Sequence, residues 1–386
     1  MFLALLALVS TAHAGPRAEF APRKPAPPEV RFGAWLQPRL TWQQGDDAVG
    51  TTSGVAFSLR RARVSTDATW LTRTDPAAID GWRGPSLVAR IDVELAADPH
   101  LAEGYVDLRA GHPLQLRVGR FPVPGAHDRA VADDRLLLPD RSLATRAGPG
   151  RDTGAAVHGF VGRHVLAWDV GVFNGEGAAN GNPDGGLRVA GRVEVSPLGG
   201  IGEHRDLLRP DWRLLGHRGV PIGTYNPMAT LTIGVFGWHG EAGSAAEERA
   251  GADLFLHWRP FNLVAGATLG RVLDEDGAVA STQGGYTVQA ALFPPGAPWA
   301  WDHLALLARI DAFDPDLDAV AAASDADAAR REITVGAKVL AGRPLFAGMD
   351  DATLLVAWIL RQEPEPQART TGYADDMLLV SAQLGW

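Results

Sequence analysis

Apolar and polar residues alternate along most of the chain, in short segments that recur from residue 31 to the last residue. In the segment 186–196, for example, Val189 and Val193 alternate with Arg188 and Arg192. Neighbouring side chains of a β-strand point to opposite faces, so each segment should form a strand with one apolar and one polar face. Between the segments fall many of the 45 glycines and 27 prolines, which are typical of turns. The pattern predicts an all-β protein.

We count about sixteen such segments. Each has roughly the nine to eleven residues that a tilted strand needs to cross a lipid bilayer. The predicted strands cover residues 31–43, 54–65, 86–96, 102–110, 113–120, 153–161, 164–173, 186–196, 229–239, 250–259, 261–271, 284–293, 303–313, 331–341, 351–361 and 375–386. The last strand ends at Trp386 and should close the barrel against the strand that begins near Arg31.

The connections between these strands alternate in length from residue 96 onward. Short ones should be turns on the periplasmic side and long ones outer loops, the asymmetry of outer-membrane β-barrels. The predicted long connections are 121–152, 174–185, 240–249, 272–283, 314–330 and 362–374. Two further long connections, 67–85 and 197–228, depart from the alternation, and the second could hold a helix or an extra hairpin.

Alternation alone does not decide which face meets water. A soluble barrel hides its apolar face, whereas a membrane barrel turns it to lipid and its polar face to the lumen. In the last strand a membrane barrel would place Ser381, Gln383 and Gly385 in the lumen. The residues then expected against lipid are Leu378, Val380, Ala382, Leu384 and Trp386. The strand count, the loop lengths and the aromatic last residue favour the membrane.

The start of the chain resembles an export signal. Residues 1–14 contain the apolar stretch Phe2–Val9 and end in Ala12-His13-Ala14, the form of a signal-peptidase site. Residues 15–29 form a leader rich in proline and arginine, and residues 30–386 form the predicted barrel. We therefore expect a protein of the outer membrane, of the Gram-negative type, that is exported through a cleaved signal peptide.

Composition and motif content narrow the classes of function that fit this chain. The net charge of −9 disfavours nucleic acid as a partner. The chain has no cysteine and therefore no disulfides. It carries no nucleophile motif, zinc-binding helix motif or phosphate-binding loop, and its eleven histidines are not spaced as metal ligands. We expect no enzyme activity and no cofactor.

The region 119–177 carries the most specific motifs. It contains Gly119-Arg120-Phe121, Gly150-Arg151-Asp152-Thr153-Gly154 and Gly171-Val172-Phe173-Asn174-Gly175, and Arg60-Arg61-Ala62-Arg63 lies upstream. These stretches resemble the phosphate-selective porin O and P family. The resemblance implies a sixteen-stranded, usually trimeric, outer-membrane channel whose third long loop folds into the lumen. The chain departs from that family in having only two lysines, Lys24 and Lys338.

The loop 121–152 would then form the constriction of the channel. Arginine guanidinium groups at a narrow point bind and select anions. The candidate constriction residues are Arg120, Arg129, Arg135, Arg141, Arg146 and Arg151. The same stretch holds five aspartates, so these arginines could instead pair within the loop and brace it.

We therefore predict a transmembrane antiparallel β-barrel that lets small hydrophilic solutes diffuse, with a possible preference for anions such as phosphate. Its expected partners are these solutes, outer-membrane lipid and two further copies in a homotrimer. Two alternatives stay open at this point. One is a barrel without conductance that acts as an adhesin or anchor, and the other is an exported β-rich hydrolase.

Overall fold

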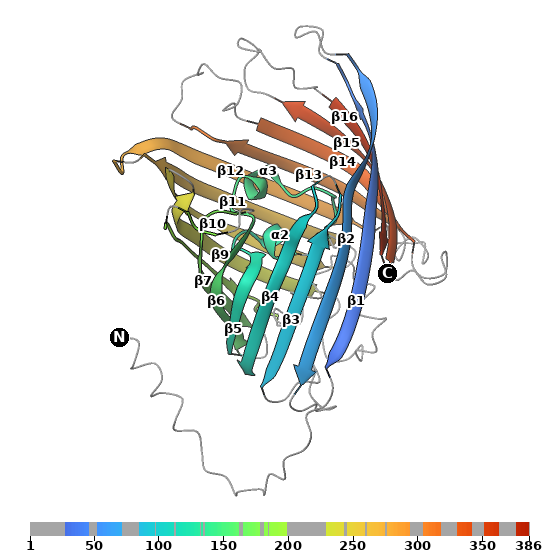
Figure 1. The fold of residues 1–386 in the computed structure, drawn as a ribbon. Helices are drawn as coiled ribbons and strands as arrows, with labels where there is room; N and C mark the ends of the chain where they lie inside the picture. Colours follow the sequence, from blue (N-terminus) through green and yellow to red (C-terminus); the bar gives the residue numbers. More distant parts are fainter. Residues whose placement is uncertain are drawn as a thin grey trace, which may run out of the picture.

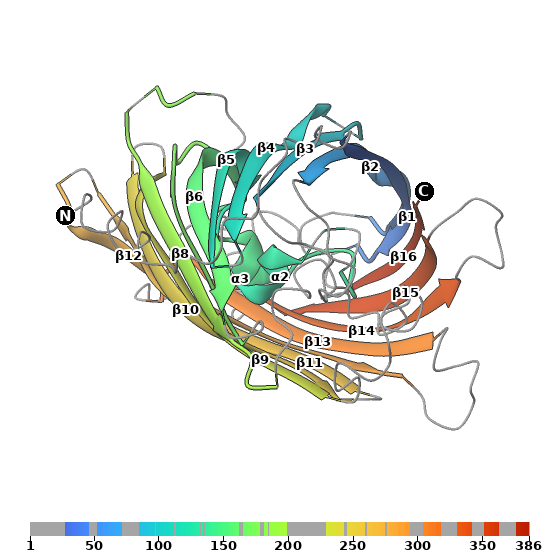
Figure 2. The same cartoon turned by 90° about the horizontal axis from the view of Figure 1, so that it is seen from below.

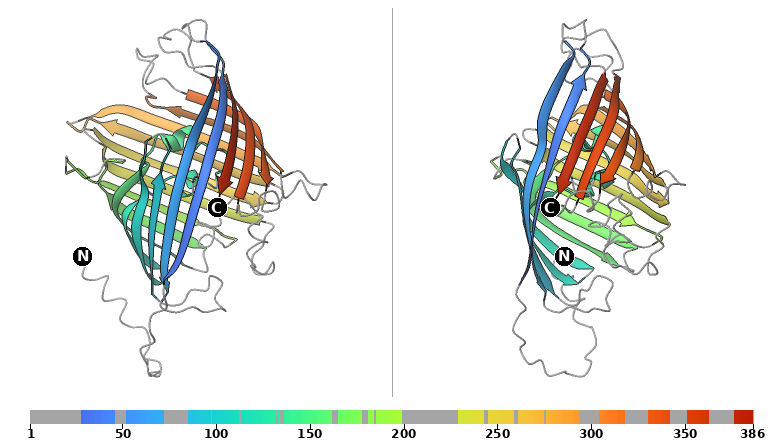
Figure 3. Two further views of the ribbon diagram at one scale, coloured as in Figure 1. Left: turned by 45° about the vertical axis from the view of Figure 1, so that its right-hand side comes forward. Right: turned by 90° about the vertical axis from the view of Figure 1, so that its right-hand side faces the viewer.

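Sixteen antiparallel strands close into a barrel in the computed structural model (Figure 1). The structure describes residues 28–45, 52–71, 85–96, 98–111, 113–131, 133, 136–161, 165–177, 181–183, 185–198, 229–242, 245–258, 261–274, 276–293, 304–317, 330–341, 351–362 and 376–385. Each strand pairs with its neighbours in sequence, and β1 pairs with β16 to close the sheet, with Leu36 opposite Leu384 (Figure 3). The predicted fold class is confirmed.

The sixteen predicted strands all exist, and their observed bounds differ from the expected ones mainly at the ends. They are β1 (Glu29–Gln43), β2 (Gly54–Leu71), β3 (Ser86–Glu94), β4 (His100–Gly111), β5 (Leu114–Pro122), β6 (Arg151–Val161), β7 (Leu166–Phe173), β8 (Arg188–Val195), β9 (Ala229–Ala242), β10 (Ala245–Trp258), β11 (Phe261–Leu273), β12 (Val279–Leu292), β13 (Leu304–Asp314), β14 (Arg330–Ala341), β15 (Asp351–Gln362) and β16 (Asp376–Gly385).

Two predicted long loops are wrong. The strands β9 and β10 continue through most of 240–249, and β11 and β12 through most of 272–283. The sequence there is rich in small and charged residues, such as Glu247 and Glu248, and lacks apolar alternation. Backbone pairing continues without apolar alternation, since Glu247 of β10 still lies opposite Gly240 of β9 and Val272 of β11.

The polarity of the barrel is inverted relative to a soluble protein. On β8 the side chains of Arg188, Arg192 and Glu194 are buried in the interior, while Val189 and Val193 are exposed on the outside. On β16, Ser381 and Gln383 are buried and the apolar residues that alternate with them are not. This is the polarity expected of a membrane barrel.

The connection between β5 and β6 turns inward rather than out into solvent. We call residues 123–150 the inner loop. It contains two short helices, α2 (His127–Ala130) and α3 (Leu143–Arg146), which lie inside the ring of strands when the barrel is viewed along its length (Figure 2). Among the described residues, no helix is long and apolar enough to cross a membrane.

A bulge in β2 places consecutive arginines on the same face. The register of β1 and β2 shifts between Gln37 and Pro38, so that Arg60 is the extra residue between Leu59 and Arg61. An extra residue changes which face the following side chains occupy. Proline suits this point because it has no N–H for the ladder. As a result Arg60 and Arg61 both reach carboxylates of the inner loop.

Several predictions fall wholly or partly on residues that the structure does not describe. The signal peptide (1–14), the leader apart from Pro28 and Glu29, most of 197–228, Arg135 and Trp386 lie outside the described residues. Glu29 itself begins β1.

Candidate functional site

The inner loop is held at the start of each short helix by an arginine–aspartate pair from the barrel wall. At α2, Arg192 donates to the carbonyl oxygen of Gly125 at 2.9 Å, and Asp253 accepts from the backbone N–H of His127 at 2.8 Å. Arg192 and Asp253 also contact each other at 2.7 Å through two N–H groups. A carboxylate at the first helical N–H satisfies a backbone donor that has no partner within the helix.

The same arrangement recurs at α3. Arg309 donates to the carbonyl oxygen of Asp140 at 2.7 Å, and Asp311 accepts from the backbone N–H of Leu143 at 2.8 Å. Lys338 adds a further hydrogen bond of 2.9 Å to the carbonyl oxygen of Leu136. These wall residues fix the backbone of the loop, so the charged inward positions of β8, β10, β13 and β14 determine where it lies.

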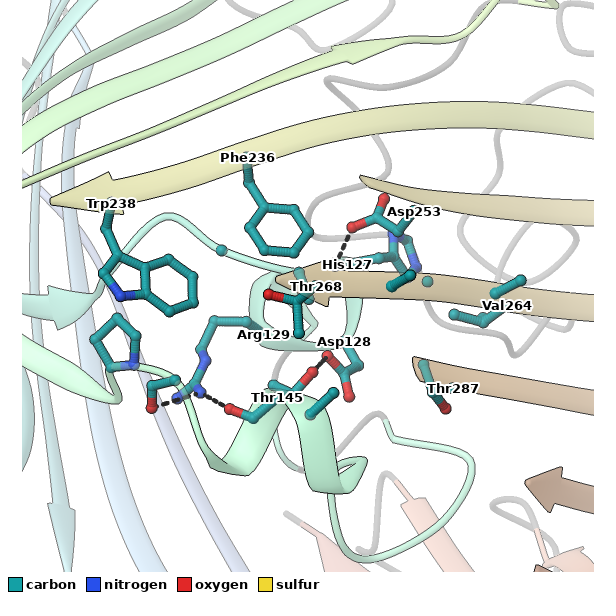
Figure 4. Close-up of a pocket in the computed structure, with 18 residues that line it drawn as sticks. His127, Asp128, Arg129, Thr145, Phe236, Trp238, Asp253, Val264, Thr268 and Thr287 are labelled. Atoms are coloured by element: carbon teal, nitrogen blue, oxygen red, sulfur yellow. Dashed lines mark hydrogen bonds between the residues drawn. The ribbon is translucent and has the colours of Figure 1, made fainter. Parts of the chain in front are cut away.

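The side of the loop that faces β9 to β12 is packed against the wall. Phe236, Trp238 and Thr268 face α2 and α3 across a cavity of about 30 Å³ (Figure 4). A buried water needs roughly 10–15 Å³, so the cavity has room for water. The His127 ring stacks on Phe255 with ring centroids 4.9 Å apart. Aromatic side chains of the wall therefore pack against the inner loop on this side.

His127 is buried by this packing. Burial, opposed by Asp253 and reinforced by Arg192, lowers the pKa of His127 below its ordinary value of 6.5. Glu194 and Asp128 are the other charged groups that act on it. The folded protein therefore keeps His127 neutral at a pH at which the unfolded chain has already taken up a proton.

A pH dependence of stability follows from His127. Below about pH 6.5 the unfolded state binds more protons at this position, so the free energy of unfolding should fall as the pH falls. We predict that thermal unfolding midpoints measured between pH 7.5 and 5.5 fall less in His127→Gln than in the wild type. The difference between the two proteins isolates His127 from the other ten histidines. Equal slopes would contradict the prediction.

Residues of the motifs that begin at Gly119, Gly150 and Gly171 connect the neighbouring ends of β5, β6 and β7. Asp152 accepts from the backbone N–H of Gly175 at 2.8 Å. Gly119 has a φ of +131°, and a Cβ there would lie 2.2 Å from the carbonyl oxygen of Gly104. Glycine is required where the backbone has positive φ and approaches its neighbour this closely. Arg120 donates to the carbonyl oxygen of Gly177 and thereby holds the connection after β7.

The predicted constriction arginines occupy different environments. Arg129 lies within the inner loop and donates to the carbonyl oxygens of Thr145 and Gly148. Arg141 and Arg151 both contact the carboxylate of Asp133. Arg146, on α3, is 46% exposed and contacts Glu332 of β14 at 3.3 Å. The structure thus brings Arg141 and Arg151 to one carboxylate, whereas Arg120, Arg129 and Arg146 contact other groups.

The arginines around Asp133 are balanced by acids. The group consists of Arg61, Arg63, Arg90, Arg141 and Arg151 with Asp67, Asp92, Glu94, Glu103 and Asp133. Five positive charges therefore meet five negative ones. Although burial alone would raise the pKa of Asp133, the surrounding arginines hold it well below its ordinary value of 3.8. This part of the expected constriction braces the loop.

A second group of arginines combines two exposed side chains, Arg60 and Arg146, with the partly exposed Arg361 and the largely buried Arg39. We call Arg39, Arg60, Arg146 and Arg361 the exposed arginine group. Asp140 pairs with Arg39 at 2.9 Å and Arg60 at 3.2 Å, and Glu332 pairs with Arg146 and Arg361, each at 3.3 Å. Four positive charges thus face two negative ones, a difference of +2. Arg60 is 42% exposed although it points into a closed barrel, so it borders the solvent of the lumen.

The two halves of this group are close enough to interact. Burial would raise the pKa of Asp140, but Arg39, Arg60 and Arg146 lower it below 3.8. The group therefore lies between the inner loop and the strands β1, β2, β14 and β15, on the side of the lumen opposite the packed cavity (Figure 2). Its charge and exposure make it the part of the described lumen best suited to meet a solute.

The fold is that of the outer-membrane porins. The chain is similar to the anion-selective porin of Comamonas acidovorans, with a TM-score of 0.56 and 11% identity over 93% of this chain and 100% of that one. It is also similar to OmpT of Vibrio cholerae in its trimer form, with a TM-score of 0.57 and 9% identity over 94% and 100%.

A third similar structure is the outer-membrane channel DcaP of Acinetobacter baumannii, with a TM-score of 0.56 and 9% identity over 93% of this chain and 98% of that one. No protein-family model matches the sequence, and no curated protein matches it. At these identities the shared feature is the barrel and its strand order.

Proposed function

We propose that the protein is an outer-membrane porin through which small hydrophilic solutes diffuse passively. The observation that carries the proposal is the inverted barrel with a wall-anchored loop inside it. The apolar outer face suits lipid, and a lumen lined with charged groups suits water and ions. A loop fixed in the lumen narrows the path, and Arg60 and Arg146 are exposed to solvent beside it.

We further propose that the channel prefers anions. The exposed arginine group carries an excess of two positive charges and borders the open part of the lumen. Rings of arginine favour anions in pores. The anion-selective porin of Comamonas acidovorans shares the fold. Phosphate is one candidate solute, but the chain offers few lysines, and Lys338 is engaged by the inner loop.

The proposal includes export and assembly. A cleaved signal peptide at residues 1–14 would deliver the chain to the outer membrane. OmpT of Vibrio cholerae was solved as a trimer, which supports a homotrimer here.

Conductance of the purified protein in a planar lipid bilayer tests the function. We expect stepwise, ohmic currents and a reversal potential in a KCl gradient that indicates chloride preference. Absence of current from protein that is folded, shown by heat-modifiable migration in gel electrophoresis, would overturn the proposal. That outcome would favour a barrel that serves as an adhesin or anchor. A reversal potential that indicates potassium preference would overturn the anion preference alone.

A further inference from the structure

Asp133 has the surroundings of a bound ligand rather than of a surface residue. One of its carboxylate oxygens receives Arg61 at 2.7 Å, Arg63 at 2.8 Å and Arg151 at 2.9 Å. The other oxygen receives Arg141 at 2.6 Å. The side chain is only 1% exposed. Four guanidinium groups therefore surround one carboxylate, from both of its oxygens.

The four arginines come from separate parts of the fold. Arg61 and Arg63 lie two residues apart on β2 and so share its inward face, Arg151 begins β6, and Arg141 belongs to the inner loop. The Trp35 ring lies 5.9 Å from the guanidinium carbon of Arg61 and 5.6 Å from that of Arg63. The site is therefore assembled by the barrel and not by the loop alone.

Three of the arginines have other partners that would hold them in place without Asp133. Arg63 also contacts Glu94 at 3.0 Å, and Arg151 contacts Glu103 at 2.9 Å. Arg141 also donates to the carbonyl oxygen of Val131. For Arg61, however, Asp133 is the only ion-pair partner among the described residues. Loss of Asp133 would leave a preformed, positively charged cavity.

We propose that these four guanidinium groups form an oxyanion-binding site whose resident ligand is the loop's own carboxylate, and that a free small oxyanion occupies it when this carboxylate is removed. Planar guanidinium N–H groups match the oxygens of a carboxylate or similar oxyanion. Chloride is a single spherical ion. It lacks the two separate oxygen acceptors with which a carboxylate contacts these four guanidinium groups. Because Asp133 is tethered, it outcompetes free anions in the native protein.

This inference rests on the proposed function only in placing the site beside a solute path, and its test does not require conduction. The variant Asp133→Ala removes the carboxylate, and formate supplies a group of the same shape. The measurement is the thermal unfolding midpoint of the detergent-solubilised protein in sodium formate and in sodium chloride at equal ionic strength. Because a ligand that binds only the folded state stabilises it, formate should raise the midpoint.

We expect Asp133→Ala to unfold several degrees below the wild type in chloride and to regain half or more of that loss in formate, in a saturable manner. If the variant does not fold in chloride, its refolding yield in formate against chloride is compared instead. The double variant Arg61→Ala/Asp133→Ala should lose the response to formate.

Asp274→Ala is the control, because it removes an aspartate whose carboxylate accepts from the backbone N–H groups of Asp276 and Ala278 in an exposed turn. It should not respond specifically to formate, nor should the wild type. The proposal is overturned if formate has no effect on Asp133→Ala or shifts all three proteins equally. Failure of the conductance experiment would leave this outcome unaffected.

Discussion

Replacing both Arg60 and Arg146 with glutamate is expected to reverse the ion preference of the channel from anions to cations. Each replacement changes the local charge by two units, so the exposed arginine group and its two acids pass from +2 to −2. At about 8 Å in water, four unit charges change the energy of an ion by about 2 kcal/mol before screening. Screening at about 0.1 M salt reduces this to about 1 kcal/mol.

The effect acts in opposite directions on anions and cations, so the permeability ratio should change by about 30-fold. Reversal potentials in a KCl gradient measure this ratio. The neutral variant Arg60→Ala/Arg146→Ala should give an intermediate value, and the difference should shrink at about 1 M salt, where the screening length is about 3 Å.

Arg271→Glu is the control for charge reversal outside the lumen. Arg271 lies on β11, two residues from the exposed Leu269 and therefore on the same outward face. This variant should keep the preference of the wild type. If the double glutamate variant also keeps it, the exposed arginine group is not the selective element.

The barrel could be predicted from the sequence because its signal is local and repeated. The alternation of Val189 and Val193 with Arg188 and Arg192 already separates the outward-facing from the inward-facing residues of β8. The strand ends between β9 and β12 could not be predicted in the same way, because backbone hydrogen bonds there continue beyond the apolar pattern. Side-chain periodicity reports which face is buried, not where the ladder stops.

The site was harder to predict because it depends on which charges meet. Among the predicted arginines, Arg146 lies in the exposed arginine group, whereas Arg141 and Arg151 turn toward Asp133. No local signal distinguishes these two outcomes, since the partners are contributed by distant strands. The Arg60-Arg61 pair was visible in the sequence, but the bulge that brings both to one face was not. Arg361 follows the apolar run of β15 and carried no signal.

Releasing the inner loop from the wall is expected to have the second large effect. In Asp311→Ala the backbone N–H of Leu143 loses its acceptor, and the buried Arg309 loses a carboxylate 3.4 Å away. Breaking a buried ion pair by removing one partner typically costs about 3–5 kcal/mol. We expect a lower thermal unfolding midpoint and, where the loop detaches, larger and noisier single-channel currents.

Asp253→Ala should act in the same way at α2, where Arg192 would keep Glu194 as a partner. The double variant Arg309→Ala/Asp311→Ala should be less destabilised than the sum of its single variants, because no unpaired buried charge remains. Asp274→Ala, in the exposed turn between β11 and β12, is the control and should change neither measurement. Wild-type currents and midpoints in both Asp253→Ala and Asp311→Ala would mean that the two arginine–aspartate pairs of the wall do not hold the loop. The constriction would then have to be fixed by the arginines around Asp133 alone.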